Sequence, residues 1–343
     1  MVAISLAYFA ASSVAGPSGS PYDLLLDSSR LADEAGLEAV WLPERHFSDF
    51  GHPYPNPSVT AAAVAAVTRR IRIRAGSVVL PLHHPVRVAE EWAVVDQLSG
   101  GRAGISFASG WHGNDFLLSR SDVSERRQVM LDGIATVAAL WRGEPRIFTD
   151  AAGREIEVRT QPRPVQPELP IWLTSGGSLP TFELAGSMGA GLLTHLVGQS
   201  PEELQQKIAA YRTAREKNGT GRGHVTLMMH THILDGSPGS ADRAKTELIR
   251  YLISSTKLDE SNGANPAAAA TARSMRADDR HAVAERGAAH FLNSGLICTA
   301  DELPERIAMV RSWDVDEIAC LIDFGFDHPS IMKSLDDLLT SLA

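Results

Sequence analysis

The seven residues Trp41–Phe47, WLPERHF, decide how the whole chain is interpreted. A largely apolar run, residues 37–42, ends there at a proline, and a glutamate, an arginine and a histidine follow directly. A buried strand cannot carry these three side chains without partners, because removing charge from water is costly. The strand therefore ends at about Leu42, and the polar triplet Glu44–His46 begins the loop after it. Parallel sheets and (β/α)8 barrels hold their reactive groups at this end of a strand.

Composition narrows the function classes. The 343 residues carry a formal net charge of −9 and are 44% hydrophobic, which suits a globular protein and argues against a grip on nucleic acid or anionic lipid. Cys298 and Cys320 are the only cysteines, so we expect no disulfide framework and a cytoplasmic location. No apolar run approaches the roughly 18 residues that a membrane helix needs, and no basic region precedes the first strand, so we expect no signal peptide.

Eight apolar strands are expected to alternate with helices along the chain. They lie at residues 2–10, 39–42, 71–80, 103–107, 171–174, 191–194, 224–234 and 318–322. Alternation over the length of one domain indicates parallel strands joined by right-handed crossovers. We predict one α/β domain over residues 1–343, a (β/α)8 TIM barrel; periodicity alone leaves an open doubly wound sheet as the alternative.

Two stretches interrupt the alternation. Residues 143–168 are polar, contain several prolines and alternate at Ile156 and Val158, which predicts a small hairpin inserted after the fourth strand. Residues 257–280 are rich in Ala, Asp and Asn with weak helical periodicity, so we expect a mobile insertion after the seventh strand.

In a barrel, the loops after the strands share one rim. Polar side chains lie there in the segments 44–46, 83–84, 109–115, 175–178 and 194–195. A single histidine in such a loop is usually a structural hydrogen-bonding group, so the functional signal is the number of His, Arg and Asn residues that converge. Trp111, in a Gly-flanked loop, fits either core packing or a surface on which a ring stacks.

The glycine-rich segment Ser175–Ser178 suits a phosphate, because glycines allow close approach and helix N-terminal N–H groups bind anions. A plain glycine turn with a serine N-cap is the alternative. No P-loop lysine follows, so a nucleoside triphosphate is not expected. His230 and His232 share a strand face, but no carboxylate is close in sequence, and we predict no metal site. Residues 108–110 lack the nucleophile-elbow pattern of a hydrolase.

Several motifs together resemble the bacterial luciferase-like flavin monooxygenases. They are residues 44–51 (ERHFSDFG), 56–57 (NP), 79–91 (VLPLHHPVRVAEE) and 96–102 (DQLSGGR). Residues 106–112 (SFASGWH) and 193–199 (LTHLVGQ) resemble the natural-product (MupA-like) branch in particular. The resemblance implies a barrel that holds reduced FMN on its C-terminal rim and reacts with O2 through a C4a-(hydro)peroxyflavin. It also implies a separate NAD(P)H:flavin reductase, a homodimer, and a small-molecule or carrier-bound substrate.

The resemblance also assigns expected roles to residues on the rim. Gly76–Ser77 would form a cis peptide supporting the flavin ring, and residues 255–285 would form a mobile lid. The expected cofactor contacts are Gly76, Ser77, Ala108, Ser109, Trp111, Ser175, Gly176, Gly177, Ser178 and Thr194. The expected substrate pocket contains His84, His112, Asn114 and His195.

The chain departs from luciferase at two positions. Luciferases carry two adjacent histidines after the glutamate, whereas this chain has Arg45 and then His46. We therefore expect His46 to handle protons, since histidine ordinarily titrates near neutral pH, with Glu44 beside it and Arg45 as a fixed positive charge. Ser109 stands where luciferase places an arginine on the FMN phosphate, so that charge must be met elsewhere. The alternatives are an F420-dependent hydride-transfer enzyme and a non-catalytic flavin-binding protein.

Overall fold

Eight parallel strands close into a barrel in the computed structural model, which describes residues 2–9, 18–48, 54–259 and 266–342. The barrel strands are β1 (Ala3–Ala7), β2 (Ala39–Leu42), β3 (Arg72–Val79), β4 (Ala103–Ala108), β7 (Ile171–Ser175), β8 (Gly191–His195), β9 (Val225–Leu234) and β11 (Glu317–Leu321). They pair in that order, and β11 returns to β1. The predicted TIM barrel is thereby confirmed, and the open sheet is excluded.

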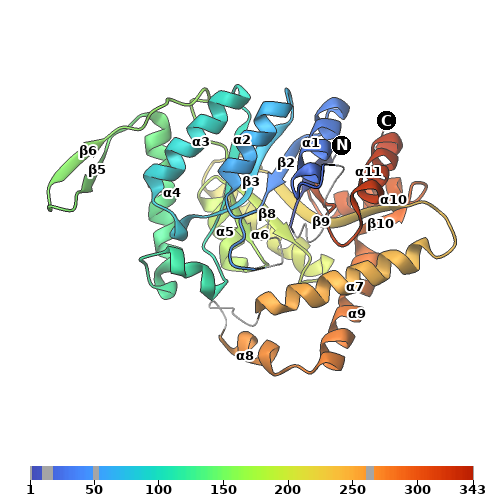
Figure 1. Ribbon diagram of the computed structural model, residues 1–343. Coiled ribbons are helices and arrows are strands. Elements are labelled where there is room, and N and C mark those ends of the chain that lie inside the picture. Colours follow the sequence, from blue (N-terminus) through green and yellow to red (C-terminus); the bar gives the residue numbers. More distant parts are fainter. Residues whose placement is uncertain (1, 10–17, 49–53, 260–265, 343) are drawn as a thin grey trace.

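Helices surround the barrel (Figure 1). They are α1 (Asp23–Ala35), α2 (Pro57–Val67), α3 (Pro85–Ser99), α4 (Arg126–Arg142), α5 (Leu179–Ser187), α6 (Pro201–Lys217), α7 (Ser240–Asp259), α8 (Pro266–Ser274), α9 (Ala277–Ser294), α10 (Leu303–Ser312) and α11 (His328–Leu342). Proline at the first or second position and a capping box at Ser200 and Glu203 define where α6 begins. This start matters because it sets the position of Lys207 on α6, which is described with the candidate site below.

An ionic cluster closes the N-terminal end of the barrel. Glu317 accepts hydrogen bonds from Arg74 (Nη1, 2.7 Å), Trp41 (Nε1, 2.8 Å), His224 (Nε2, 2.7 Å) and Ser5. Burial alone would raise the pKa of this carboxyl, but the Arg74 guanidinium and His224 lower it to about 2. These donors satisfy the buried carboxylate, which would otherwise carry an uncompensated charge.

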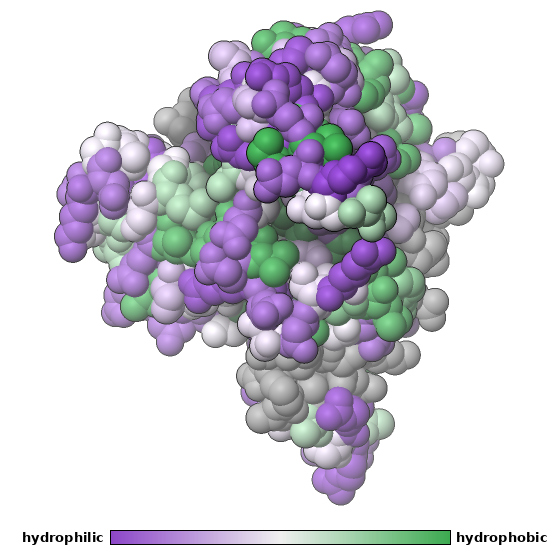
Figure 2. All heavy atoms as spheres, turned by 90° about the vertical axis from the view of Figure 1, so that its left-hand side faces the viewer, coloured by the Kyte–Doolittle hydropathy of each residue, from purple (hydrophilic) through white to green (hydrophobic). Residues whose placement is uncertain are grey.

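The hairpin expected within residues 143–168 is formed by β5 (Arg146–Thr149) and β6 (Glu155–Val158). It extends from the barrel beyond α4 (Figure 1). Figure 2 faces this side of the molecule and shows apolar side chains interrupted by hydrophilic ones. Ile147 and Ile156 are among the exposed apolar residues.

The region after β9 differs from the sequence expectation. Residues 266–274 form helix α8, although weak periodicity over residues 257–280 indicated an irregular segment. The sequence pattern predicts a helix near residues 281–293, which α9 confirms and extends to residue 277. Alanine has the highest helix propensity, and the stretch is rich in it. An additional strand, β10 (Leu296–Thr299), pairs with the second half of β9. Part of the expected lid, residues 260–265, lies outside the described residues, and the mobility of 255–285 stays a prediction.

Candidate active site

The floor of the C-terminal mouth is apolar. Side chains alternate along each strand, so every second residue points into the barrel. The inner cluster consists of Ala7, Ala39, Trp41, Trp172, Leu193, Met228, Ala319 and Leu321, with Phe9 packed against it. The polar groups of the rim therefore lie above a layer of apolar side chains.

Glu44 is the centre of a three-residue cluster at the rim. Its Oε1 accepts from Nε2 of His46 (2.8 Å) and from Nε2 of His83 (2.7 Å), and its Oε2 accepts from the backbone N–H of Val79 (2.8 Å). The carboxylate side chain has no exposed surface. Burial raises its pKa, but the hydrogen bonds from His46 and His83 outweigh burial and hold the pKa below its usual value. Glu44 is therefore an anion that two imidazoles share.

His83 and His46 both present Nε2 to this carboxylate, which makes Nε2 the protonated ring nitrogen of each. The pKa of His83 is lowered by burial and raised more strongly by Glu44, so the net shift is upward. The ring of His46 is only 10% exposed, and its Nδ1 has no hydrogen-bond partner among the described residues. That nitrogen is available to accept a proton from a bound molecule.

Arg45 lies beside this cluster as a pre-positioned cation. Its guanidinium stacks over the ring of Phe9, 4.4 Å from the centroid, and its backbone N–H donates to the carbonyl of Tyr54 (2.8 Å). Burial lowers the pKa of Arg45, although Tyr251, Asp115 and Glu44 partly offset that effect. Its buried Nε finds no hydrogen-bond partner. An orphaned buried donor calls for a ligand or water to satisfy it.

The Ser175–Ser178 turn could hold an anion, because Lys207 of α6 reaches it. We call the turn and this lysine the Lys207 cradle. Ser175 Oγ accepts from the backbone N–H groups of Gly177 (3.3 Å) and Ser178 (3.2 Å), which fixes the turn. Gly177 has a φ of 106°, and a Cβ there would lie 3.1 Å from Gln199 Oε1 and 3.4 Å from Lys207 Nζ. The Ser178 hydroxyl makes no capping bond at the start of α5.

Lys207 is a candidate anion-binding residue that sequence reasoning missed. Its Nζ donates to Gln199 Oε1 (2.8 Å), and Gln199 Nε2 in turn donates to the carbonyl of His195 (2.6 Å). A signal existed: Lys207 lies on the same helical face as the buried Leu204 and Tyr211. A cation on the inward face of a helix has a partner or a ligand there. Lys207 could supply the positive charge that Ser109 lacks.

His195 and Thr194 differ in what they do at the end of β8. His195 Nδ1 accepts from the N–H of Val197 (3.1 Å), so Nε2 carries the proton, and a Cβ at Gly176 would lie 3.5 Å from that Nε2. Burial lowers the pKa of His195 to about 4, and the ring is a neutral donor facing the cradle. Thr194 is fully buried and donates to the carbonyl of Ser175 (2.8 Å). It fixes the turn from behind.

The Gly76–Ser77 peptide is cis, as the family resemblance implies. Gly76 faces the barrel interior, where a Cβ would lie 3.2 Å from Trp41. A chain of hydroxyls joins neighbouring strands, since Thr174 Oγ1 lies 2.7 Å from Ser77 Oγ and 2.6 Å from Ser106 Oγ. Ala108, the last residue of the neighbouring strand β4, is half-buried.

The remaining expected site residues lie away from the Glu44 cluster and the Ser175–Ser178 turn in their contacts. His112 is buried and pairs with Asp115 (Nδ1 to Oδ1, 2.8 Å), and the half-buried Trp111 packs against the core. Asn114 is exposed. His84 N-caps α3 and lies against Phe148 of the hairpin, 5.4 Å between ring centroids. The structure thus puts His83, and not His84, on Glu44.

Among the described residues, no group of three or more His, Cys, Asp or Glu side chains could hold a metal ion. No helix in the same residues is long and apolar enough to cross a membrane.

Comparison with known proteins adds to this geometry. The oxygenase component of flavin-dependent trigonelline monooxygenase from Acinetobacter baylyi is 27% identical over 218 residues, 62% of this chain and 60% of that protein. The chain thus spans less than two-thirds of that relative's length. The crystal structure of monooxygenase RslO1 from Streptomyces bottropensis superposes with a TM-score of 0.78 at 22% identity, over 99% of this chain and 98% of the other.

An F420-dependent secondary alcohol dehydrogenase shares the same fold. It superposes with a TM-score of 0.72 at 15% identity, over 99% of this chain and 98% of the other. The family model described as luciferase-like monooxygenase matches residues 3–317. This protein therefore belongs to the luciferase-like monooxygenase family.

Proposed function

We propose that this protein is the oxygenase component of a two-component flavin monooxygenase. It would take reduced FMN from a separate NAD(P)H:flavin reductase in the cytoplasm and use O2. Its substrate would be a small-molecule or carrier-bound intermediate of natural-product biosynthesis. The main support is that the turn contacted by Lys207 and the Glu44 cluster both lie after strands, at the same end of one barrel. The relative named as an oxygenase component supports the separate reductase.

The cradle suits the phosphate of FMN. Lys207 provides an ammonium group, His195 a neutral N–H and Ser178 a hydroxyl without a capping bond. The first turn of α5 adds the positive end of a helix dipole. Gly177 leaves the space that a Cβ would fill between the turn and Lys207. These groups would hold a dianion without the arginine that luciferase uses.

The Glu44 cluster would accept or donate a proton during the reaction of the substrate. Because Glu44 is kept ionised and accepts from Nε2 of His46, Nδ1 of His46 would be the ring nitrogen that faces a proton on a bound molecule. Arg45 would add a fixed charge and an unfilled Nε donor toward an oxyanion of the substrate. When bound, reduced flavin supplies the electrons that activate oxygen. The apolar floor with Trp41 and Leu193 would keep water from the reacting atoms.

An anaerobic titration tests this function. Reduced FMN is added to the protein, followed by oxygen, and the rate of flavin reoxidation is compared with that of free flavin. We expect saturable binding and a reoxidation course that differs from free reduced FMN. Binding of F420 in place of FMN, or FMN binding with reoxidation identical to free flavin, would favour the F420-dependent or the non-catalytic alternative.

A homodimer is proposed through α2 and α3. Val59, Val94 and Leu98 are 66%, 42% and 57% exposed on these two adjacent helices. Paired apolar helices are suited to an isologous interface. Light scattering on the Leu98→Asp variant is expected to give a monomer where the parent gives a dimer. A dimer that persists in the variant would place the interface elsewhere.

A further inference from the structure

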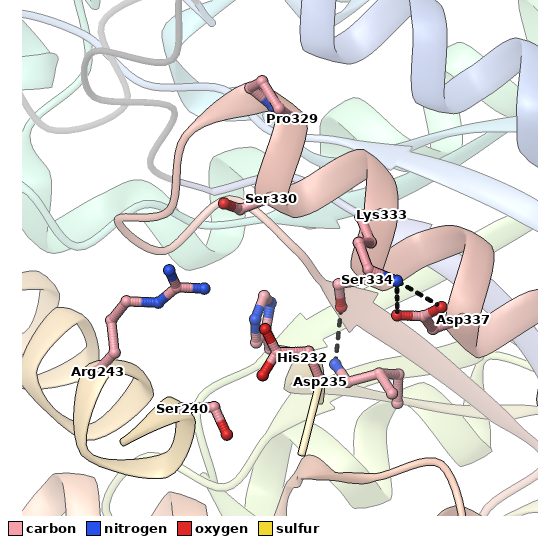
Figure 3. Close-up of a pocket in the computed structure, with 10 residues that line it drawn as sticks. His232, Asp235, Ser240, Arg243, Pro329, Ser330, Lys333, Ser334 and Asp337 are labelled. Carbon is pink, nitrogen blue, oxygen red and sulfur yellow. Dashed lines mark hydrogen bonds and ion pairs between the residues drawn. The ribbon is translucent and has the colours of Figure 1, made fainter. Parts of the chain in front are cut away.

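A cavity of about 300 Å³ lies apart from the mouth residues, between the end of β9, the first turn of α7 and α11 (Figure 3). We call it the Arg243 pocket. Its polar lining includes His232 from β9, Ser240 and Arg243 from α7, and Ser330, Lys333 and Asp337 from α11. Helices α7 and α11 follow the seventh and eighth barrel strands, β9 and β11. None of the Glu44 cluster or the Lys207 cradle contributes to it.

His232 is a buried polar side chain that is held by ring stacking. It is 6% exposed, and no hydrogen bond or ion pair of its ring nitrogens is found within the described part of the chain. The ring lies flat against Phe326, with centroids 3.8 Å apart and planes 7° apart. Its pKa is lowered to about 4, first by burial and then by Arg243. A neutral imidazole fixed at a cavity wall offers one N–H donor.

Arg243 gives the pocket its charge. Its guanidinium carbon lies 5.6 Å from the Phe326 ring centroid, and Figure 3 shows the group directed across the pocket toward His232. It forms no ion pair among the described residues. Lys333 is paired with Asp337 (2.9 Å), and Asp235 accepts from the N–H and hydroxyl of Ser237 (3.0 and 2.6 Å). The carboxyls of Asp235 and Asp327 are near enough for Arg243 to contribute to their lowered pKa, after the hydrogen bonds from Ser237 and Ser330, but neither carboxyl forms an ion pair with Arg243 among the described residues.

We propose that the Arg243 pocket binds a phosphate group, as a phosphomonoester or as free phosphate. The guanidinium fork, the His232 N–H and the Ser240 and Ser330 hydroxyls come from three separate elements, which suits a tetrahedral oxyanion with several acceptors. The N-terminal turns of α7 and α11 add favourable dipoles. The volume exceeds what a bare ion fills, so an ester group has room. This site is separate from the one proposed for the FMN phosphate.

Calorimetric titration with inorganic phosphate tests the site, with chloride at matched ionic strength as background. Because the Lys207 cradle could also take phosphate, the titrations are made in the Lys207→Gln background. We expect saturable binding there, weakened by roughly tenfold or more on adding Arg243→Gln, since a charge-assisted contact is lost. Arg250→Gln on the same helix is the matched control; Arg250 pairs with Glu247 and does not line the pocket. It should bind phosphate as its parent does.

Glycerol 3-phosphate provides the second arm. Tighter binding of the ester than of inorganic phosphate identifies a phosphomonoester, and the reverse order identifies free phosphate; either supports the site if Arg243→Gln abolishes the response. No saturable phosphate binding in Lys207→Gln, or equal losses in Arg243→Gln and Arg250→Gln, would overturn the proposal. FMN affinity should be unchanged in Arg243→Gln, so failure of this site and failure of the flavin proposal give different results.

Discussion

Replacing Lys207 by glutamine is expected to weaken FMN binding about tenfold and to leave riboflavin binding unchanged. The substitution removes an ammonium group that lies 3.4 Å from the Cβ position of Gly177 and replaces it with a neutral amide. A hydrogen bond to a charged group contributes about 1.5–3 kcal/mol. Lys207 is half-buried, so screening by solvent puts the expected loss near the lower limit, which corresponds to about one order of magnitude.

The assay is the change in flavin fluorescence on titrating protein into FMN or riboflavin, which differ only in the phosphate. Lys217→Gln, at the exposed C-terminal end of the same helix, removes the same charge away from the cradle and should have no effect. Lys207→Arg should retain most of the affinity. Equal FMN affinity in Lys207→Gln and the parent, or a parallel loss of riboflavin binding, would refute the assignment of the phosphate to this turn.

The other outcomes concern the Glu44 cluster, the turn and the barrel base. His83→Gln should slow the oxygen reaction of bound flavin by roughly tenfold or more and change its pH profile, because His83 donates to Glu44. The rates are measured by stopped flow, and His84→Gln should react at nearly the parental rate. Equal effects of the two substitutions would contradict the assigned cluster. Gly177→Ala should weaken FMN binding in the fluorescence assay, because its φ of 106° and the 3.1 Å approach to Gln199 leave no place for a methyl group; unchanged affinity would contradict the close approach. Folding lowers the pKa of Glu317 to about 2 from 4.5, so its stabilisation is complete above about pH 4.5 and fades as the pH falls toward 2. Glu317→Gln should therefore cost on the order of 3 kcal/mol at pH 7, and urea unfolding should show a smaller difference from the parent at pH 3; a difference that does not depend on pH would contradict the ionic role.

The barrel could be predicted from the sequence because each strand is a short apolar run that ends in polar or glycine-rich residues. Periodicity of this kind is local, and it located all eight barrel strands. β10 was missed because the four residues Leu296–Thr299 directly follow α9 and lie outside the strand–helix alternation of the barrel. The α8 helix was missed because its alanine-rich sequence carries little apolar contrast, whereas the helix predicted near residues 281–293 is confirmed by α9.

The site was predictable only where its residues follow strands. Glu44 and His46 follow β2 directly, so sequence pattern found them. Choosing between His83 and His84 depends on which of two adjacent side chains points back across the rim, and that direction is fixed by the short 3-10 turn at Leu80–Leu82. Lys207 lies in the middle of a helix, far from the turn in sequence, and only tertiary packing brings it to Gly177.

The central claim is that one mouth of the barrel holds FMN with its phosphate on the Ser175–Ser178 turn. A crystal structure of the protein with FMN tests it most directly. The account predicts the phosphate within hydrogen-bond reach of Lys207 and Ser178, and the isoalloxazine lying toward His46 and Arg45. The phosphate of the bound FMN itself in the Arg243 pocket, or a flavin ring on the far side of the mouth from His46, would contradict it.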